Sequence, residues 1–253
     1  MTLRNPNYLL SQLLLTAAEK YPDRPALIFP DARLTYAQLS ELSQRYARAM
    51  VGHELSRGDH VGILAVNRLE YIALLFACMF SGTVAVLLNA RFRVQELQHA
   101  ATHCDLKWIF VGQNEGVPHA ARLLEALPEL VNADASGTVS VSAAPMLERV
   151  VTLDAFDQAG FTAFSDFLAE ETLATPAQFD ARQEAVIASE PALIMFTSGT
   201  TSLPKGCMLT QESVFRTSLA MRNRLSLSTD ERMWDPLPMF HMASILPMLS
   251  LFH

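Results

Sequence analysis

The sequence predicts an α/β fold in which helices cover a mainly parallel sheet, arranged in layers. Short apolar runs alternate with longer segments of helical period, which is typical of strands joined by parallel crossovers. Residues 84–88 are continuously apolar, as expected for a central parallel strand that is covered on both faces. The chain has 253 residues, half of them hydrophobic, which is enough for one large domain or two small ones.

The chain starts with a predicted amphipathic helix. Leu9, Leu13 and Ala17 recur at helical spacing. Polar residues interrupt the apolar stretch that a signal peptide would need. A helix of the domain is therefore favoured over a targeting segment.

A short hairpin and a capped helix follow. Residues 26–29 predict a strand, residues 30–32 a turn, and residues 33–34 the returning strand. Thr35 and Gln38 have the spacing of a capping box, in which each side chain accepts a hydrogen bond from the other residue's backbone N–H. The helix behind them has one apolar face, formed by Leu39, Leu42, Tyr46 and Met50.

The next stretch predicts the centre of the parallel sheet. A strand at residues 60–66 leads into a helix at 70–80 and the strand at 84–88. A helix at 94–103 and a strand at 108–111 continue the same alternation. Two successive strand–helix–strand units of this kind indicate parallel pairing.

Composition excludes several functional classes. Residues 71–90 carry no charge over the length of a bilayer span, but Ser81-Gly82 divides them into helix and strand, so no transmembrane segment is expected. The formal net charge is −7 and no basic cluster is present, which argues against nucleic-acid binding. The three cysteines are scattered without a Cys-x-x-Cys pair and indicate reduced thiols in a cytoplasmic protein.

The second half of the chain begins with connecting segments. Residues 131–145 are rich in Ala, Ser, Gly and Val and predict a loop before a strand at 149–153. Residues 161–168 predict a short helix, and residues 175–190 a polar connection. We find no candidate catalytic or ligand-binding residues in these segments.

The stretch from Pro191 to Gly206 carries the strongest functional signal. Apolar residues 192–196 predict a buried strand, which breaks into a loop of small and hydroxyl-bearing residues and then a lysine. Backbone N–H groups, hydroxyl donors and a positive charge together suit a polyphosphate, although an ordinary surface turn has a similar composition. The spacing is not that of the Walker loop, because Lys205 is followed by Gly206 instead of Ser or Thr.

A last unit follows this loop. Residues 206–209 predict a brief strand, and Thr210 is an expected N-cap for a helix that continues through Val214 and Met221. The chain then ends inside an apolar run, residues 245–252, without the usual signals of a finished helix, which suggests a fragment. Exposure of that run would favour self-association into a homo-oligomer.

The order Thr-Ser-Gly-Thr-Thr-x-x-Pro-Lys-Gly, residues 197–206, resembles the phosphate-binding signature of the adenylate-forming superfamily. This superfamily contains acyl-CoA synthetases, luciferases and peptide-synthetase adenylation domains. Ser202 departs from the pattern, because the family usually has Gly there. Further stretches resemble motifs of the same superfamily: residues 34–39, 58–64, 82–90 and 236–241.

The resemblance implies that residues 1–253 are the front part of the large N-terminal domain of an acyl-CoA synthetase. The fold it implies is an incomplete, layered parallel-sheet subdomain. The family's adenine-binding, ribose-binding and hinge motifs and the small C-terminal domain are absent from this sequence.

The resemblance also implies a two-step reaction. A small-molecule carboxylic acid attacks the α-phosphate of ATP, with Mg²⁺, and a thiol, commonly coenzyme A, then displaces AMP. No protein ligand of the metal is assigned. The implied phosphate-binding residues are Thr197, Ser198, Gly199, Thr200, Thr201, Ser202, Lys205 and Gly206.

Two roles within this loop can be stated more closely. Lys205 would neutralise charge beside the phosphates, and Gly206 would let the backbone turn close by. If position 202 needs a positive φ, a residue other than Gly costs about 1 kcal/mol there. We therefore expect Ser202 to give a functional but less mobile loop with one more hydroxyl donor.

Histidines supply the remaining candidates. His241, in the Pro-x-Pro-x-Phe-His stretch, is the catalytic candidate, because in acyl-CoA ligases the matching His lies near the acyl-binding wall and the adenylate. Peptide-synthetase domains usually have Asp there, so Phe240-His241 favours a carboxylate that is not an amino acid. His99 and His103 lie four residues apart on a predicted helix, but without further ligands they predict a solvated face and no zinc site.

Two alternatives stay open. An adenylate former could hand its acyl group to a carrier protein or to oxygen instead of coenzyme A. The chain could also be a catalytically silent nucleotide-binding or interaction fragment. The sequence does not identify the carboxylic acid; fatty acid metabolism is the expected setting.

Overall fold

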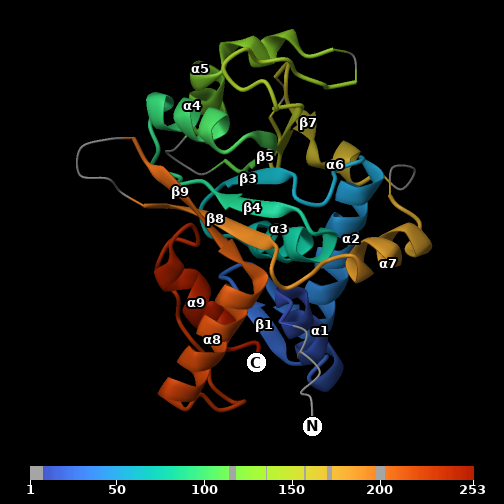
Figure 1. Ribbon diagram of the computed structural model, residues 1–253, viewed down its shortest axis with the longest axis vertical. Helices are drawn as coiled ribbons and strands as arrows, with labels where there is room; N and C mark the ends of the chain where they lie inside the picture. The colour runs from blue at the N-terminus through green and yellow to red at the C-terminus, as the bar shows by residue number, and fades with distance from the viewer. Residues whose placement is uncertain (1–7, 114–117, 135, 157, 170–172, 198–202) are drawn as a thin grey trace.

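The computed structural model describes residues 8–113, 118–134, 136–156, 158–169, 173–197 and 203–253 (Figure 1). Within these residues, seven strands form one sheet in the order β7-β6-β5-β3-β4-β8-β9. The pairs from β7 to β8 are parallel, and only β8–β9 is antiparallel. The strands are β3 (His60–Leu64), β4 (Val84–Leu87), β5 (Leu106–Val111), β6 (Arg149–Thr152), β7 (Thr162–Ala163), β8 (Pro191–Thr197) and β9 (Lys205–Thr210). The predicted α/β class is confirmed.

Helices cover both faces of this sheet (Figure 1). Along β5, Trp108 and Phe110 enter one buried cluster while Ile109 and Val111 enter the other, because successive side chains of a strand point to opposite faces. The first face is covered by α1 (Leu10–Lys20), α2 (Tyr36–Gly52), α3 (Leu69–Ser81), α7 (Pro176–Glu184), α8 (Gln211–Leu225) and α9 (Met242–Ser250). The second face is covered by α4 (Val94–His103) and α5 (His119–Ala126).

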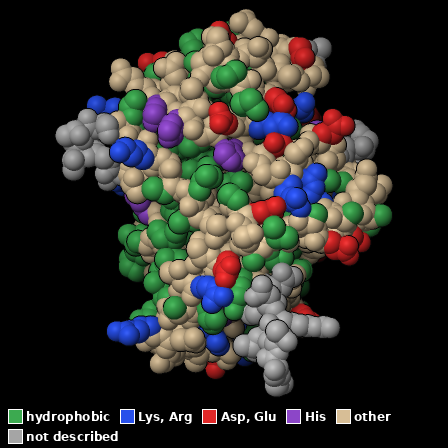
Figure 2. Space-filling model, viewed as in Figure 1, with side chains coloured by type: hydrophobic (Ala, Val, Ile, Leu, Met, Phe, Trp, Pro, Cys, Tyr) green, Lys and Arg blue, Asp and Glu red, His purple; other side chains and the backbone are tan. Residues whose placement is uncertain are grey.

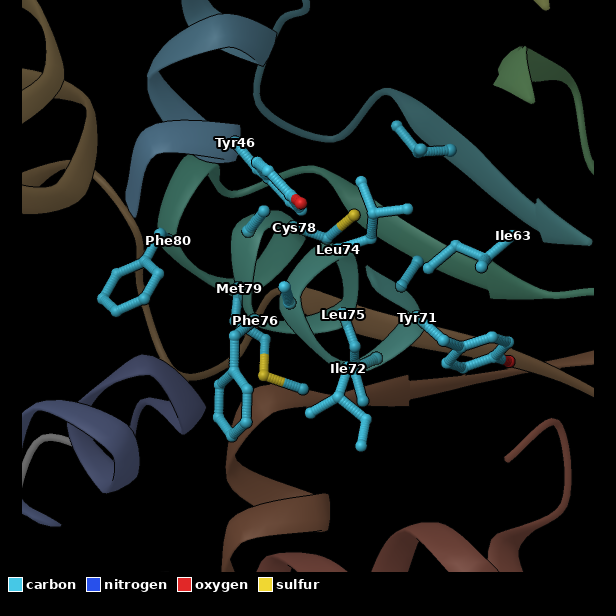
Figure 3. Packing of buried hydrophobic residues seen from close by; sticks show 14 of the residues in the cluster. Tyr46, Ile63, Tyr71, Ile72, Leu74, Leu75, Phe76, Cys78, Met79 and Phe80 are labelled. Carbon is cyan, nitrogen blue, oxygen red and sulfur yellow. The ribbon is translucent and has the colours of Figure 1, made fainter. Parts of the chain in front are cut away.

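The uncharged stretch 71–90 forms the buried helix and central strand that were predicted. Every residue of α3 from Tyr71 to Ser81 is buried, and Figure 3 shows its side chains radiating in all directions into the core. Gly82 ends the helix with a φ of 72°, a left-handed conformation that glycine adopts without strain. β4 follows, fully buried between β3 and β8. No helix in the described part of the chain is long and apolar enough to cross a membrane.

The N-terminal elements also match their predictions. β1 (Pro25–Ile28) pairs antiparallel with β2 (Arg33–Thr35). The capping box at the start of α2 is present: the Thr35 hydroxyl accepts from Gln38 N at 3.2 Å, and Gln38 Oε1 accepts from Thr35 N at 2.9 Å. These bonds satisfy backbone donors that the first helical turn leaves free.

Several connecting segments differ from the prediction. Residues 161–168 combine strand β7 with a short helix, α6 (Phe164–Phe167), because the first residues pair with β6 at the sheet edge. The polar connection 175–190 contains α7, which starts at a second capping box formed by Thr175 and Gln178 and buries Phe179. Helix α5 and a 3-10 helix, Pro128–Asn132, were not predicted.

Most of the apolar run at residues 245–252, whose exposure would favour self-association, is buried. Ile245 and Leu249 are fully buried, and Phe252 packs edge-on against Tyr36 with 5.3 Å between ring centroids. The apolar side chains of α9 pack into the same buried cluster as those of α3. Of this run, Leu246, Pro247 and Leu251 remain partly exposed.

Candidate functional site

The described residues of the candidate phosphate-binding motif lie where β8 ends and β9 begins. The carboxyl ends of the parallel strands share one edge of the sheet, outside which open α/β sheets bind ligands. Thr197 is the last residue of β8, and Lys205, the first of β9, is its partner in the register. Both residues are exposed. The structure thus places the first and penultimate residues of the motif side by side.

Five residues of the motif lie outside the described part of the structure. They are Ser198, Gly199, Thr200, Thr201 and Ser202. Their assignment to phosphate binding, and the effect of Ser202, stay predictions.

Gly206 lies within β9, opposite Phe196. A Cβ atom at this position would lie 3.0 Å from Ile194 Cγ2 and 3.1 Å from Cys104 Sγ. The glycine is therefore explained by close packing against β8 and the end of α4, in place of the backbone turn that we expected.

The two histidines of α4 differ from each other. His99 is half-buried, and its Nε2–H donates to the carbonyl oxygen of the buried Pro204 at 3.0 Å. His103 is exposed and stacks on His99 with 4.9 Å between ring centroids. The predicted solvated face therefore applies to His103 and not to His99. No group of three potential ligands (His, Cys, Asp or Glu) that could hold a metal occurs among the described residues.

His241 is the N-cap residue of α9, and it is exposed. Its carbonyl oxygen accepts from Ser244 N at 3.0 Å, and its ring lies 4.8 Å from the ring of the buried Phe240. The helix start and the anchored Phe240 fix the backbone at His241, while the imidazole remains accessible to a ligand.

Two residues that hold the His241 segment were missed in the sequence. Asn67, in the turn after β3, donates through Nδ2 to Leu237 O at 2.7 Å and accepts at Oδ1 from Met239 N at 2.8 Å. Asp235 Oδ2 accepts from the Ser244 hydroxyl at 2.5 Å. The available signal for Asn67 was its position directly after the predicted strand at residues 60–66, because ligands bind at the carboxyl ends of such strands. Nothing near Asp235 in the sequence pointed to its hydrogen bond with Ser244.

An ion-pair network joins three strand ends at the same edge. Arg68 donates to Glu70 Oε2 at 2.7 Å and to Asp154 Oδ2 at 2.8 Å, and Asp154 Oδ2 also accepts from Gln113 N at 2.6 Å. Burial acts to lower the pKa of the Arg68 guanidinium, but the hydrogen bonds and charges of Glu70 and Asp154 raise it above its ordinary value. The network fixes the segments that follow β3, β5 and β6.

An arginine-lined pocket lies between the start of α4 and helix α5. It has a volume of about 440 Å³, and its basic residues are Arg91, Arg93 and Arg122. Arg122 Nη1 donates to Phe92 O at 3.0 Å, and the ring of Phe92 packs edge-on against that of Phe196 with 5.2 Å between ring centroids. Figure 2 shows histidine side chains gathered over α4, close to Lys and Arg side chains. This pocket was not predicted, although the Arg-x-Arg spacing after β4 was a signal for it.

Comparisons with known proteins agree with this architecture. A family model described as AMP-binding enzyme matches residues 14–253. The mitochondrial medium-chain acyl-CoA ligase ACSF2 of Homo sapiens is 29% identical over 239 residues, covering 92% of this chain and 39% of the relative. The long-chain-fatty-acid–CoA ligase FadD13 of Mycobacterium tuberculosis is 28% identical over 224 residues, covering 85% and 37%. The chain spans less than half the length of these relatives.

Solved structures share the fold over nearly the whole chain. The anthranilate CoA ligase AuaEII in complex with anthranoyl-AMP matches with a TM-score of 0.77 and 23% identity, over 97% of this chain and 44% of the other. The apo structure of MbtA from Mycobacterium smegmatis matches with a TM-score of 0.78 and 25% identity, over 98% and 42%.

Proposed function

Because the chain belongs to the AMP-binding enzyme family, we propose that it forms the phosphate-binding part of an acyl-CoA ligase that activates a carboxylic acid with ATP. The observation that carries the proposal is the register of β8 and β9, which pairs the exposed Thr197 with the exposed Lys205 at the carboxyl edge of the sheet. Relatives named as acyl-CoA ligases support the reaction class.

In the proposed first step, a carboxylate oxygen of the substrate forms a bond to the α-phosphorus of ATP, and the bond to the pyrophosphate oxygen breaks. The protein's part is electrostatic, because charge on the departing pyrophosphate must be stabilised. The Thr197 hydroxyl can donate to a phosphate oxygen, and the Lys205 ammonium can offset its charge. Bound Mg²⁺ would neutralise further phosphate charge.

In the proposed second step, the thiol of coenzyme A adds to the acyl carbonyl and AMP leaves. Coenzyme A carries several phosphate groups, and the arginine-lined pocket, with three arginines against the one carboxylate of Glu125, suits such an anion. Guanidinium groups bind phosphates through paired N–H donors. Arg91 and Arg93 are exposed at this pocket, whereas Arg122 also holds the turn that presents them.

We assign His241 to the acyl side of the site. Its backbone is fixed by Asn67 and Asp235 through the residues around it, and its ring is exposed. The imidazole in this position can donate a hydrogen bond to the acyl-adenylate.

ATP–pyrophosphate exchange with the complete protein tests the proposal. We expect exchange that requires Mg²⁺ and one of a panel of carboxylic acids, and AMP release that coenzyme A accelerates. Acceleration by a phosphopantetheinylated carrier protein instead would favour the alternative acceptor. ATP binding without exchange for any acid would favour a silent nucleotide-binding protein and contradict the proposal.

Two accompanying expectations remain proposals. Residues 1–253 alone should not complete the reaction, because they span less than half the length of their relatives. We also propose a cytoplasmic location, which rests on the scattered cysteines of the sequence; the human relative is named as mitochondrial.

A further inference from the structure

Residues in and beside α4 contact β8 and the beginning of β9, the two strands on either side of the candidate loop. Phe92, just before the helix, packs edge-on against Phe196 of β8. His99, in the middle, bonds the carbonyl oxygen of Pro204, directly before β9. Cys104, just after the helix, lies against Gly206, where even one added carbon would be crowded. One helical segment therefore defines where the two strand ends lie.

The bond from His99 controls the position of Lys205. The Pro204 carbonyl and the Lys205 amide nitrogen belong to the same peptide unit, which is planar and rigid. A hydrogen bond that fixes this oxygen therefore fixes the direction in which the Lys205 backbone leaves the unit. Pro204 is buried and its φ is restrained by its ring, so ψ is the only backbone torsion of this residue that is left for the hydrogen bond to fix.

His99 is itself held in place. Its ring stacks on that of His103 at an interplanar angle of 15°, one turn further along the helix. The start of α4 is also anchored, since Glu96 Oε2 accepts from Arg93 N at 2.8 Å. The imidazole can therefore present Nε2–H to Pro204 without first being ordered.

We propose that His99 is a positioning residue for ATP, which acts by holding the Pro204–Lys205 peptide so that the Lys205 ammonium meets the phosphates. The inference rests on the proposed function for its ligand, but the contact that it depends on is independent of that function. His99 does not touch the nucleotide in this proposal; it acts only through Lys205.

The variants His99→Leu and His99→Gln test this role in the complete protein. Leu has similar bulk and no donor, whereas the Gln side-chain amide keeps a donor near the place of Nε2. We expect His99→Leu to raise KM for ATP about fivefold, the effect of one net hydrogen bond, with KM for the carboxylic acid unchanged. His99→Gln should stay within about twofold of wild type, since it keeps that bond.

A matched control is Gln98→Leu, an exposed position on the same helix that receives the same new residue. It should leave KM for ATP unchanged. Equal KM values for His99→Leu and wild type, or an equal rise in His99→Leu and His99→Gln, would overturn the positioning role.

Hydrogen exchange separates this inference from the proposed function. Amide exchange in peptides covering residues 203–210 should be faster in His99→Leu than in His99→Gln or Gln98→Leu, with or without enzymatic activity. Unchanged exchange would refute the structural contact. Faster exchange in His99→Leu, in a protein whose wild type shows no pyrophosphate exchange, would retain the contact and refute the proposed function.

Discussion

Asn67 and Met239 are 172 residues apart in sequence, yet Asn67 Oδ1 accepts a hydrogen bond from Met239 N at 2.8 Å. The same side chain donates to Leu237 O at 2.7 Å, so one amide binds the backbone on both sides of residue 238. This pair of bonds joins the turn after β3 to the segment that carries His241. The position of the segment that we propose for the acyl side thus depends on a residue from the first third of the chain.

Asn67→Ala and Asn67→Asp should both weaken this connection. Ala removes both bonds, at about 1 kcal/mol of stability for each. Asp keeps the acceptor for Met239 but places a carboxylate oxygen against Leu237 O. Urea denaturation and KM for the carboxylic acid are the measurements. An unchanged KM in both variants would show that the segment keeps its position without Asn67.

Lys205→Ala should reduce ATP–pyrophosphate exchange about 100-fold, the usual effect of removing one preorganised charge-stabilising group. Lys205→Arg keeps the charge and should recover part of the rate. Because Lys205 is exposed, Tm should change little in either variant. Full activity of Lys205→Ala would remove this residue from phosphate binding.

Gly206→Ala should destabilise the protein by roughly 1–3 kcal/mol, because the new methyl would lie 3.0–3.1 Å from Ile194 and Cys104. Removing the sulfur relieves one of these contacts, so Cys104→Ala should cost less in the Gly206→Ala background than in wild type. A double-mutant cycle by urea denaturation measures this coupling. Strictly additive changes in the free energy of unfolding would mean that β9 moves away, so that the new methyl group does not crowd Cys104.

Arg91→Ala should raise KM for coenzyme A roughly tenfold, the effect of one charge-assisted hydrogen bond, and leave ATP–pyrophosphate exchange unchanged. Arg33→Ala, an exposed arginine on β2, is the matched control. Kinetics of both half-reactions distinguish the cases. An equal KM in the two variants would argue against a phosphate site in the arginine-lined pocket.

We expect the free energy of unfolding to fall in mild acid because of His53. Burial lowers the pKa of its imidazole, the positive charge of Arg149 lowers it further, and the hydrogen bond to Phe167 O opposes them. The unfolded chain, with a His pKa of about 6.5, therefore binds more protons than the folded protein as the pH falls below that value. Above it, both states are neutral and His53 contributes no pH dependence.

Urea denaturation at pH 7.5 and 5.5 in wild type and His53→Gln tests this. Gln keeps a donor for Phe167 O and does not titrate, so the variant should lose less stability between the two conditions. An equal loss in both proteins would assign the pH dependence to other groups.

Local patterns predicted much of this protein. The helix at 94–103 and the capping box of Thr35 and Gln38 follow from residues that lie within a few positions of one another. The buried character of residues 71–90 follows from their lack of charge, and the motif at residues 197–206 indicated the family. Such features depend on short-range hydrogen bonding and hydrophobic period, which a sequence displays directly.

Only the tertiary structure decided which distant residues meet. The two residues of β7 are extended because β6 lies beside them, and residues 245–252 are buried because α9 packs on the cluster around α3. The bonds from His99 to Pro204 and from Asn67 to Met239 span 105 and 172 positions. No local propensity encodes such contacts, because they form only when separate elements pack together. The sequence by itself therefore determined the family and the elements with strong local signals, whereas packing across the sheet decided β7 and how the candidate site is held.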